Sequence, residues 1–200
     1  MLMMGRVQGQ FEGGQLKATA KQDQLGYAFV GGEGKHVAQF RVNGFSFSRL
    51  APYQTWQQLR NEAKTLWESY RQIVGAALPV VRLGLRYVNQ LDLPQPVRDF
   101  RDFIRSYPEI SSDLPQQLAG FFMQVQIPQE DIGAMLVLSE VMVPPARPDV
   151  VSLVLDIAVF MQGLKLESDD EVWSAMEVLR VRKNLIFEGC ITNNTRELIS

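Results

Sequence analysis

The clearest hydrophobic pattern in the chain is an alternation of apolar and polar side chains over residues 80–94. The apolar side chains share one parity, namely Val81, Leu83, Leu85, Tyr87 and Leu91. The opposite parity carries Arg82, Arg86 and Gln90. Because successive side chains of a strand point to opposite faces, this segment is predicted to be a strand with one buried face.

Three further apolar segments are predicted to be strands, at residues 120–128, 133–143 and 149–160. The connections between them are short, which is typical of consecutive antiparallel strands. We therefore expect an antiparallel meander in the second half of the chain.

A hairpin is predicted near the N-terminus, from residues 26–30 and 36–50, because two apolar stretches flank the glycine-rich segment GGEGK. In the second arm, Ala38 and Phe40 share a parity that Phe45 and Phe47 do not. A bulge at Asn43-Gly44 would place these four side chains on the same face, because one extra residue shifts a period-2 pattern by one.

Two long helices are predicted from apolar side chains spaced by three and four residues. The first is expected to open at Pro52 and to run to about residue 74. The second is expected to begin after Ser168, which forms a capping box with Glu171, and to stop at Gly189. A short helix is also predicted over residues 97–107.

These elements predict an α+β fold, with a mainly antiparallel sheet and two long amphipathic helices packed on one face. The 200 residues are 46% hydrophobic and 21% charged, which fits a single α+β domain over residues 1–200. Residues 1–24 are expected to be poorly ordered or a diverged first strand.

Charge and cysteine content narrow the possible partners and the compartment. The net charge is −2, from 20 basic and 22 acidic residues, so no global attraction to nucleic acid is expected. No segment approaches the roughly 20 apolar residues of a membrane span, and the start of the chain does not resemble a signal peptide. With Cys190 as the single cysteine, the sequence is compatible with a cytoplasmic location.

The usual catalytic clusters are absent from the sequence. His36 is the only histidine and Cys190 the only cysteine, which argues against a histidine-based triad and against a cysteine zinc site. Cys190 follows a helix end, where the helix dipole opposes thiolate formation. The GGEGK segment lacks the spacing of a phosphate-binding loop. We expect no catalytic residue, no metal site and no cofactor.

Two carboxylates within apolar strands leave an alternative open. Glu140 and Asp156 lie on strands predicted to be neighbours, and the alternative is that they share a raised pKa or a metal ion. The simpler interpretation, which we favour, pairs each carboxylate with a basic residue of a neighbouring strand, such as Arg82 or Arg86.

Basic and polar side chains in the second half of the terminal helix raise a similar choice. Arg180, Lys183 and Asn184 lie on or beside its apolar stripe. Lysine and arginine stems can cover a core while the charge reaches solvent, which is the interpretation we favour. The alternative is a polar binding site, whose candidate residues are Arg82, Arg86, Asp156, Arg180, Lys183 and Asn184.

The terminal helix also carries the spacing LR-x-x-KN-x-x-FE-x-x-IT, in residues 179–192. This spacing resembles the C-terminal signature of an uncharacterised, sporadically distributed bacterial family, and RLGLRYVNQLDLP resembles a strand of that family. The resemblance extends over residues 25–195 and implies no reaction, cofactor or catalytic residue. Relatives have a further N-terminal strand with a P-x-x-E-like segment, which this chain does not match. That difference favours pairing of a sheet edge with a second chain.

Three classes of function therefore remain. The first, which we favour, is a noncatalytic interaction or regulatory protein of a bacterial multi-protein system, with a protein partner or self-association as a homodimer. The second is a protein that binds a small apolar ligand in a cavity between helices and a curved sheet, with Arg86, Asp156 or Asn184 as polar groups. The third is a metal-dependent hydrolase or nuclease that uses Glu140 and Asp156. Nucleic acid and membrane are not expected as partners.

Overall fold

The structure is a computed structural model. It describes the backbone of residues 2–12, 15–31, 34–52, 54–75, 78–116, 118–145 and 147–199. Within these ranges, side chains are described from Leu25 onward.

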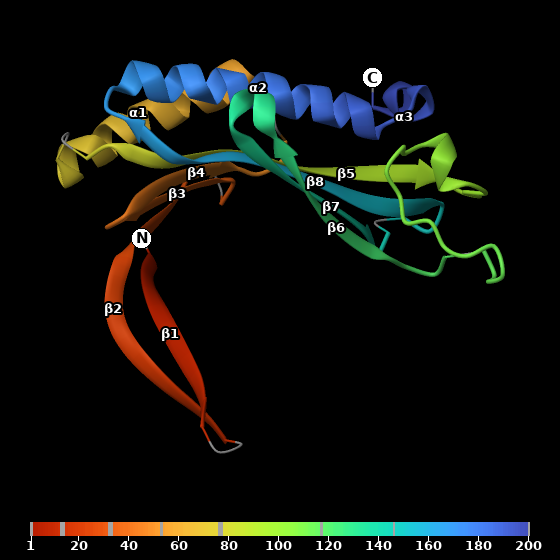
Figure 1. The fold of residues 1–200 in the computed structure, drawn as a ribbon, viewed down its shortest axis with the longest axis horizontal. Helices are drawn as coiled ribbons and strands as arrows, with labels where there is room; N and C mark the ends of the chain where they lie inside the picture. Colours follow the sequence, from red (N-terminus) through yellow and green to blue (C-terminus); the bar gives the residue numbers. More distant parts are fainter. Residues whose placement is uncertain are drawn as a thin grey trace. The chain divides into compact units, whose positions relative to one another are not determined.

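The chain forms an α+β fold, as predicted, but its strands form two antiparallel sheets of four strands each instead of one (Figure 1). By their internal contacts the residues divide into two compact units, Met1–Leu78 and Pro79–Ser200, and each unit contains one of the sheets. The single domain expected from the sequence stays a prediction. Each unit is described below by itself.

The first unit is a meander of four strands followed by a helix. Its elements are β1 (Leu2–Glu12), β2 (Gln15–Gly31), β3 (His36–Arg41), β4 (Gly44–Arg49) and α1 (Trp56–Val74). The strand expected at residues 26–30 is the end of β2, and a strand also occupies most of the N-terminal segment for which we expected disorder or a diverged strand. The side chains of residues 1–24 lie outside the described part.

The predicted bulge at Asn43-Gly44 is wrong, because the chain turns there. Arg41 pairs with Gly44 across a two-residue turn, which makes β3 and β4 a hairpin of their own. In such a hairpin Phe40 lies opposite Phe45, so an even-numbered residue pairs with an odd-numbered one. The change of parity that suggested a bulge is thus the signature of the turn.

Helix α1 starts at Trp56, four residues after the expected start at Pro52. The hydroxyl oxygen of Thr55 accepts a hydrogen bond from the backbone N–H of Gln58, at 3.3 Å, and so caps the helix. The buried ring of Tyr70 lies 5.6 Å from that of Phe40, which fixes the helix to the β3–β4 hairpin.

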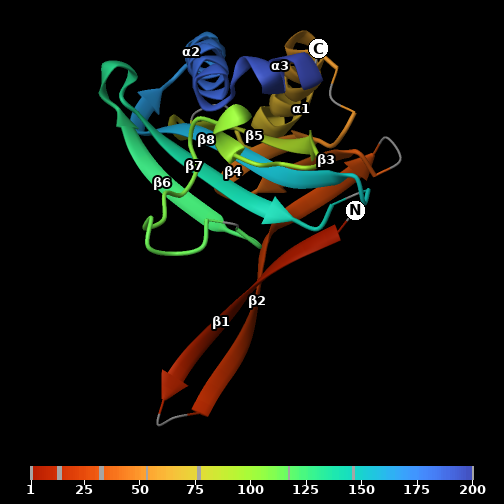
Figure 2. The same cartoon turned by 90° about the vertical axis from the view of Figure 1, so that its right-hand side faces the viewer.

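The second unit contains the predicted meander. Its elements are β5 (Val80–Pro94), β6 (Phe122–Gln129), β7 (Ala134–Val143), β8 (Val150–Leu166), α2 (Asp169–Cys190) and α3 (Asn193–Leu198). The strand order is β5-β8-β7-β6, all antiparallel, so β5 and β6 are the two edges. Figure 2 shows α2 and α3 on the same face of this sheet.

The covered face of the second sheet follows from its register. Leu85 lies opposite Val159, which lies opposite Leu136, and this row faces α2. The largest of the fully buried side chains of this unit are Leu93, Ile104, Leu155, Ile157, Leu179 and Ile191. The apolar parity predicted for β5 is therefore the one that the helix covers.

The predicted capping box of α2 is confirmed. The Ser168 hydroxyl accepts a hydrogen bond from the backbone of Glu171, and the Glu171 carboxylate accepts one from the backbone of Ser168, at 3.2 and 3.0 Å. Gly189 does not stop the helix, which continues to Cys190.

The helix predicted over residues 97–107 is wrong. Only a single 3₁₀ turn forms, at Phe100–Asp102, and the backbone that follows pairs with the end of α2. Ile104 bridges Ile191, and the N–H of Arg105 donates to the carbonyl of Cys190 at 2.7 Å. Backbone hydrogen bonds to the end of α2 replace those that a helix would have made within the segment. The spacing of apolar residues in the sequence does not predict such distant partners.

Candidate functional site

The six polar residues proposed as one site do not converge, because the second sheet separates them. Arg82 and Arg86 share the parity of Asp156 in the paired register, and these three side chains lie on the face without helices. The other three residues lie on α2, which covers the opposite face. Chemistry that needs all six residues together is therefore excluded.

Arg86 and Asp156 form an ion pair on the open face, which confirms for Asp156 the pairing that we favoured from the sequence. For Glu140 that pairing is wrong, because its described partner is the Ser106 hydroxyl and not a basic residue. The guanidinium donates from Nε to Oδ1 at 2.8 Å and from Nη2 to Oδ2 at 2.5 Å. These hydrogen bonds, and then the charge of Asp156, raise the pKa of Arg86. The Arg86 side chain is 66% exposed, so the pair contacts solvent.

Arg82 lies on the same face of the sheet as this pair and stacks on an aromatic ring. Its guanidinium carbon lies 4.7 Å from the ring centroid of Phe160, within the range of a cation–π contact. Val88 and Phe122, whose parity in the register is the same, are 61% and 68% exposed. The open face is thus partly apolar and partly charged.

Lys183 lies on the covered side, with its ammonium 3.7 Å from the ring centroid of Tyr87. Burial, and then the charge of Arg180, lower the pKa of Lys183 to about 8. Among the described residues no carboxylate lies within ion-pair distance of Lys183. The expected snorkelling to solvent is therefore incomplete, because the ammonium itself is partly desolvated.

The side chains of Arg180 and Asn184 have surroundings that differ from those of Lys183. Arg180 forms an ion pair along the helix with Glu177, at 3.4 Å between Nη1 and Oε2. Asn184 is exposed. Two residues of the C-terminal motif, Leu179 on the helix and Ile191 just after it, are buried in the core.

The metal-site hypothesis for Glu140 and Asp156 is wrong. Asp156 lies opposite Ser139, and Glu140 lies opposite Leu155, so the two carboxylates point to opposite faces of the sheet. They cannot share an ion or a proton. No group of three or more potential metal ligands gathers within the part of the chain that the structure describes.

Glu140 is instead part of a buried polar cluster that sequence reasoning missed. The Ser106 hydroxyl donates to Oε1 of Glu140 and is hydrogen-bonded to the thiol of Cys190. Glu140 is only 2% exposed, and its Oε2 has no hydrogen-bond partner among the described residues. Burial raises the pKa of Glu140 to about 7.

Cys190 has a raised pKa, first because it is buried, which agrees in direction with the expectation of an unreactive thiol. The cause is burial together with the nearby carboxyl, whereas we had invoked the helix dipole. The sequence signal for this cluster is an acid within the apolar run of β7, but residue 106 lies in a loop whose position only the tertiary structure fixes.

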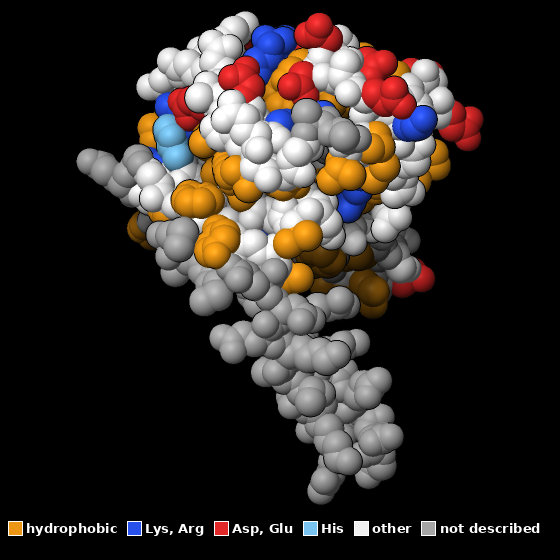
Figure 3. Space-filling view, turned by 90° about the vertical axis from the view of Figure 1, so that its left-hand side faces the viewer, with side chains coloured by type: hydrophobic (Ala, Val, Ile, Leu, Met, Phe, Trp, Pro, Cys, Tyr) orange, Lys and Arg blue, Asp and Glu red, His pale blue; other side chains and the backbone are white. Residues whose placement is uncertain are grey.

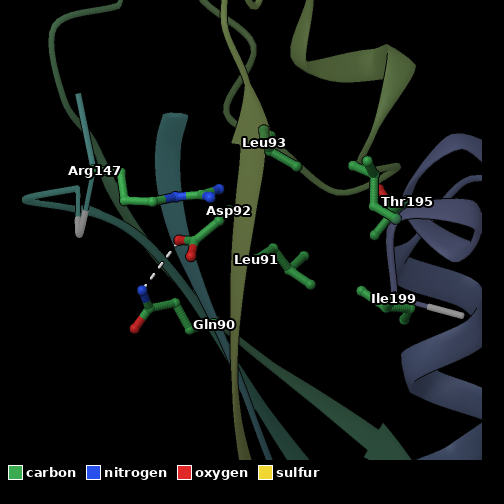
Figure 4. Close-up of a pocket in the computed structure, with 8 residues that line it drawn as sticks. Gln90, Leu91, Asp92, Leu93, Arg147, Thr195 and Ile199 are labelled. Carbon is green, nitrogen blue, oxygen red and sulfur yellow. Dashed lines mark hydrogen bonds between the residues drawn. The ribbon is translucent and has the colours of Figure 1, made fainter. Parts of the chain in front are cut away.

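A pocket of about 280 Å³ lies at the C-terminal end of β5 (Figure 4). Its lining residues are Gln90, Leu91, Asp92, Leu93, Arg147, Thr195, Leu198 and Ile199. Asp92 accepts hydrogen bonds from Ser152 at 2.6 Å and from Gln90 at 3.1 Å, and these bonds lower its pKa. None of the polar residues expected in a ligand cavity lines this pocket.

Strand β6 forms one of the two free edges of the second sheet. Its apolar side chains Phe122, Val125 and Ile127 are 68%, 36% and 42% exposed. Its sequence, FMQVQIPQ, contains no charged residue. Among the described residues, no strand pairs with this edge.

The register shows which backbone groups of β6 point outward. The carbonyl of Phe121 accepts a hydrogen bond from the N–H of Met142, at 3.1 Å, so odd-numbered residues bond to β7. In an antiparallel pair the bonded residues alternate. The N–H and C=O groups of Phe122, Gln124 and Gln126 therefore point to the free edge.

The other edge strand, β5, has the features that protect an edge from unwanted pairing. It carries three exposed charged side chains, those of Arg82, Arg86 and Asp92. Natural sheets use such charges to discourage edge-to-edge association. On β6 the only comparable device is Pro128, which lies at the end of the strand. We therefore take the β6 edge as the candidate functional site.

No family model, no curated protein and no solved structure matches the chain. In the described part, no helix is both long and apolar enough to span a bilayer. On the face shown in Figure 3, lysine and arginine side chains are scattered among acidic and neutral ones and form no continuous basic patch.

Proposed function

We propose that the protein is a noncatalytic interaction protein of a bacterial multi-protein system, and that its binding element is the free edge of β6. The observation that carries the proposal is an uncharged edge strand whose outward N–H and C=O groups belong to Phe122, Gln124 and Gln126. An extended segment that adds to such an edge satisfies these groups with its own backbone. The exposed apolar side chains would supply burial.

The ion pair on the open sheet face supports a binding role more than a catalytic one. The carboxylate of Asp156 accepts the bidentate hydrogen bonds of an arginine, so its oxygens are already engaged. Glu140 has a shifted pKa but is 2% exposed and is covered by Ser106. We propose a cytoplasmic location, which the single free thiol of Cys190 favours.

A second candidate function is the binding of a small ligand in the pocket at the end of β5. Its volume of about 280 Å³ is near the lower limit for ligand sites. Leu91, Leu198 and Ile199 offer apolar contact, and Arg147 offers a charge. Native mass spectrometry of the purified protein tests this candidate, because a bound molecule adds its mass to the 22.7 kDa of the chain.

Site-specific photo-crosslinking in cells tests the proposed function. A photoreactive amino acid at Gln126 lies on the free edge, whereas one at Lys165, which is 77% exposed, serves as the control away from that edge. We expect a discrete protein adduct from position 126 that position 165 does not give. Equal adducts from both positions, or none from position 126, would contradict the proposal.

A proline variant sharpens this test. Gln124→Pro removes an outward N–H and the hydrogen bond from the Gln124 side chain to the Ser139 hydroxyl, while leaving the backbone bonds from β6 to β7 intact, as Pro128 already does. Val125→Pro, the matched control, removes an N–H that β7 uses and should unfold the sheet. We expect Gln124→Pro to abolish the adduct at Gln126 while the circular dichroism spectrum stays that of the wild type.

A further inference from the structure

We infer that the strand which completes the β6 edge is β6 of a second copy of this chain, antiparallel and centred on Gln124. The inference rests on the proposed function of this edge and names its partner. The two copies would then form one continuous sheet, with four strands from each.

The outward backbone groups of β6 match those of an identical strand. With Gln124 opposite Gln124 of the second copy, Phe122 lies opposite Gln126 of that copy, and the reverse pair follows from the two-fold symmetry. Every outward N–H and C=O of these three residues then has a partner. Six backbone hydrogen bonds follow from this count.

The position of Pro128 favours this register over its nearest alternative. Centring on Val125 would place Pro128, which has no N–H, opposite Phe122 of the second copy and leave the carbonyl of Phe122 without a donor. Centring on Gln124 places Pro128 opposite Gly120, beyond the paired residues. Both registers make six backbone hydrogen bonds within β6, but only with Gln124 on the axis does every paired residue bond through both its N–H and its C=O.

The side chains of β6 are also compatible with an identical partner. On the helix-covered side, Met123 would lie opposite Val125 of the second copy, and Phe121 opposite Ile127, so apolar side chains meet apolar ones. No like charges approach one another, because β6 carries no charge. Charged edges such as that of β5 lack this neutrality.

The two-fold axis stands perpendicular to the shared sheet, so both copies of α2 lie on the same side of it. In an antiparallel ladder, the side chains of directly opposite residues point to the same face of the sheet. The helix-covered face of one copy therefore continues into the helix-covered face of the other. The interface is isologous and closes on itself. Strand addition at this edge would therefore stop at two copies.

Charge substitutions at Gln124 test the inference. In Gln124→Lys or Gln124→Glu, two like charges would meet on the axis, whereas a mixture of the two variants brings opposite charges together. By light scattering after size exclusion we expect the wild type at twice 22.7 kDa, each variant at 22.7 kDa, and the mixture again at twice 22.7 kDa. Circular dichroism checks that both variants fold.

Three outcomes would overturn the inference. A wild type that stays at 22.7 kDa at all concentrations excludes the second copy, while an adduct of position 126 with another protein would still support the proposed function. A wild-type dimer that persists in both single variants uses another surface. If the separate variants are monomers and their mixture is too, the charges do not meet across an axis at Gln124.

Disulfide trapping provides a second measurement that does not depend on charge. In a Cys190→Ala background, Met123→Cys protein mixed with Val125→Cys protein should form a disulfide between the copies, because opposite residues that are not hydrogen-bonded have Cα atoms about 4.5 Å apart. Neither protein alone should do so efficiently. Self-crosslinking of Val125→Cys alone would overturn the register and place the axis on Val125.

Discussion

Glu140 and Asp156 lie on adjacent strands, but their carboxylates point to opposite faces of the second sheet. The register decides this, because Asp156 lies opposite Ser139 and not opposite Glu140. One carboxylate is therefore paired with Arg86 on the open face, and the other is buried beside Ser106 under the helix-covered face. Their different surroundings lead to different predictions.

The raised pKa of Glu140 should make stability depend on pH. In the unfolded chain the carboxyl loses its proton near its ordinary value of 4.5, whereas in the folded chain it keeps the proton up to about pH 7. The stability contribution is fully present below 4.5 and is lost as pH rises through about 7. The shift corresponds to a loss of about 3 kcal/mol over this interval.

Glu140→Gln should remove this dependence, because the amide keeps the shape and does not ionise. Urea unfolding at several pH values from about 4 to about 8, which spans the shift in the pKa of Glu140, measures this dependence. Cys190, the titratable neighbour in this cluster, stays neutral throughout because its pKa is raised. Parallel curves for the wild type and the variant would show that Glu140 ionises freely in the folded state.

Lys183→Met should be neutral or stabilising by about 1 kcal/mol at neutral pH, because it removes a partly desolvated charge and retains the apolar stem. The lowered pKa also predicts that the stability of the wild type rises between about pH 8 and 10.5, where the folded chain has released the proton and the unfolded chain has not. Thermal unfolding of the variant, with Lys165→Met as an exposed control, measures the change. A loss of several kcal/mol would indicate a buried partner charge.

The Arg86–Asp156 pair should contribute little to stability, although its geometry is bidentate. With Arg86 66% exposed, solvent screens the interaction, and a double-mutant cycle with Arg86→Ala and Asp156→Ala should give a coupling below about 1 kcal/mol. The coupling should decrease with added salt. A coupling of several kcal/mol that salt does not change would mean that the open face is covered in solution.

Ser168→Ala should destabilise the second unit by about 1 kcal/mol, because it removes the hydroxyl that accepts the N–H of Glu171 at the start of α2. Ser174→Ala is the matched control, since it makes the same chemical change at an exposed position inside the helix. The control should be neutral or slightly stabilising, because alanine is the better helix former. Equal effects of the two variants on urea unfolding would argue against the capping box.

The strands of the second unit were predictable because their patterns are local. The alternation over residues 80–94 gave β5 with both of its ends, and β6, β7 and β8 begin within two residues of their predicted starts. The failures occurred where a distant partner decides the structure. Residues 97–107 have helical periodicity, yet they pair with the end of α2 through Ile104.

The candidate sites were less predictable than the strands. The Arg86–Asp156 pair followed from parity on neighbouring strands. The Glu140 cluster did not, because Ser106 and Cys190 come from a loop and a helix end that lie far from Glu140 in the sequence. Both parities of β7 are largely apolar, so the pattern did not show which face the helix covers.

The sequence by itself determined the α+β class, the antiparallel meander and the cap of α2, because these depend on side chains a few residues apart. Only the tertiary structure decided that the strands divide into two sheets, that Glu140 and Asp156 face apart, and that β6 is a free edge. Burial and edge exposure are properties of neighbours in space. Strand β7 has a partner on both sides, whereas β6 has a partner on one side only, and this difference in neighbours decides their different roles.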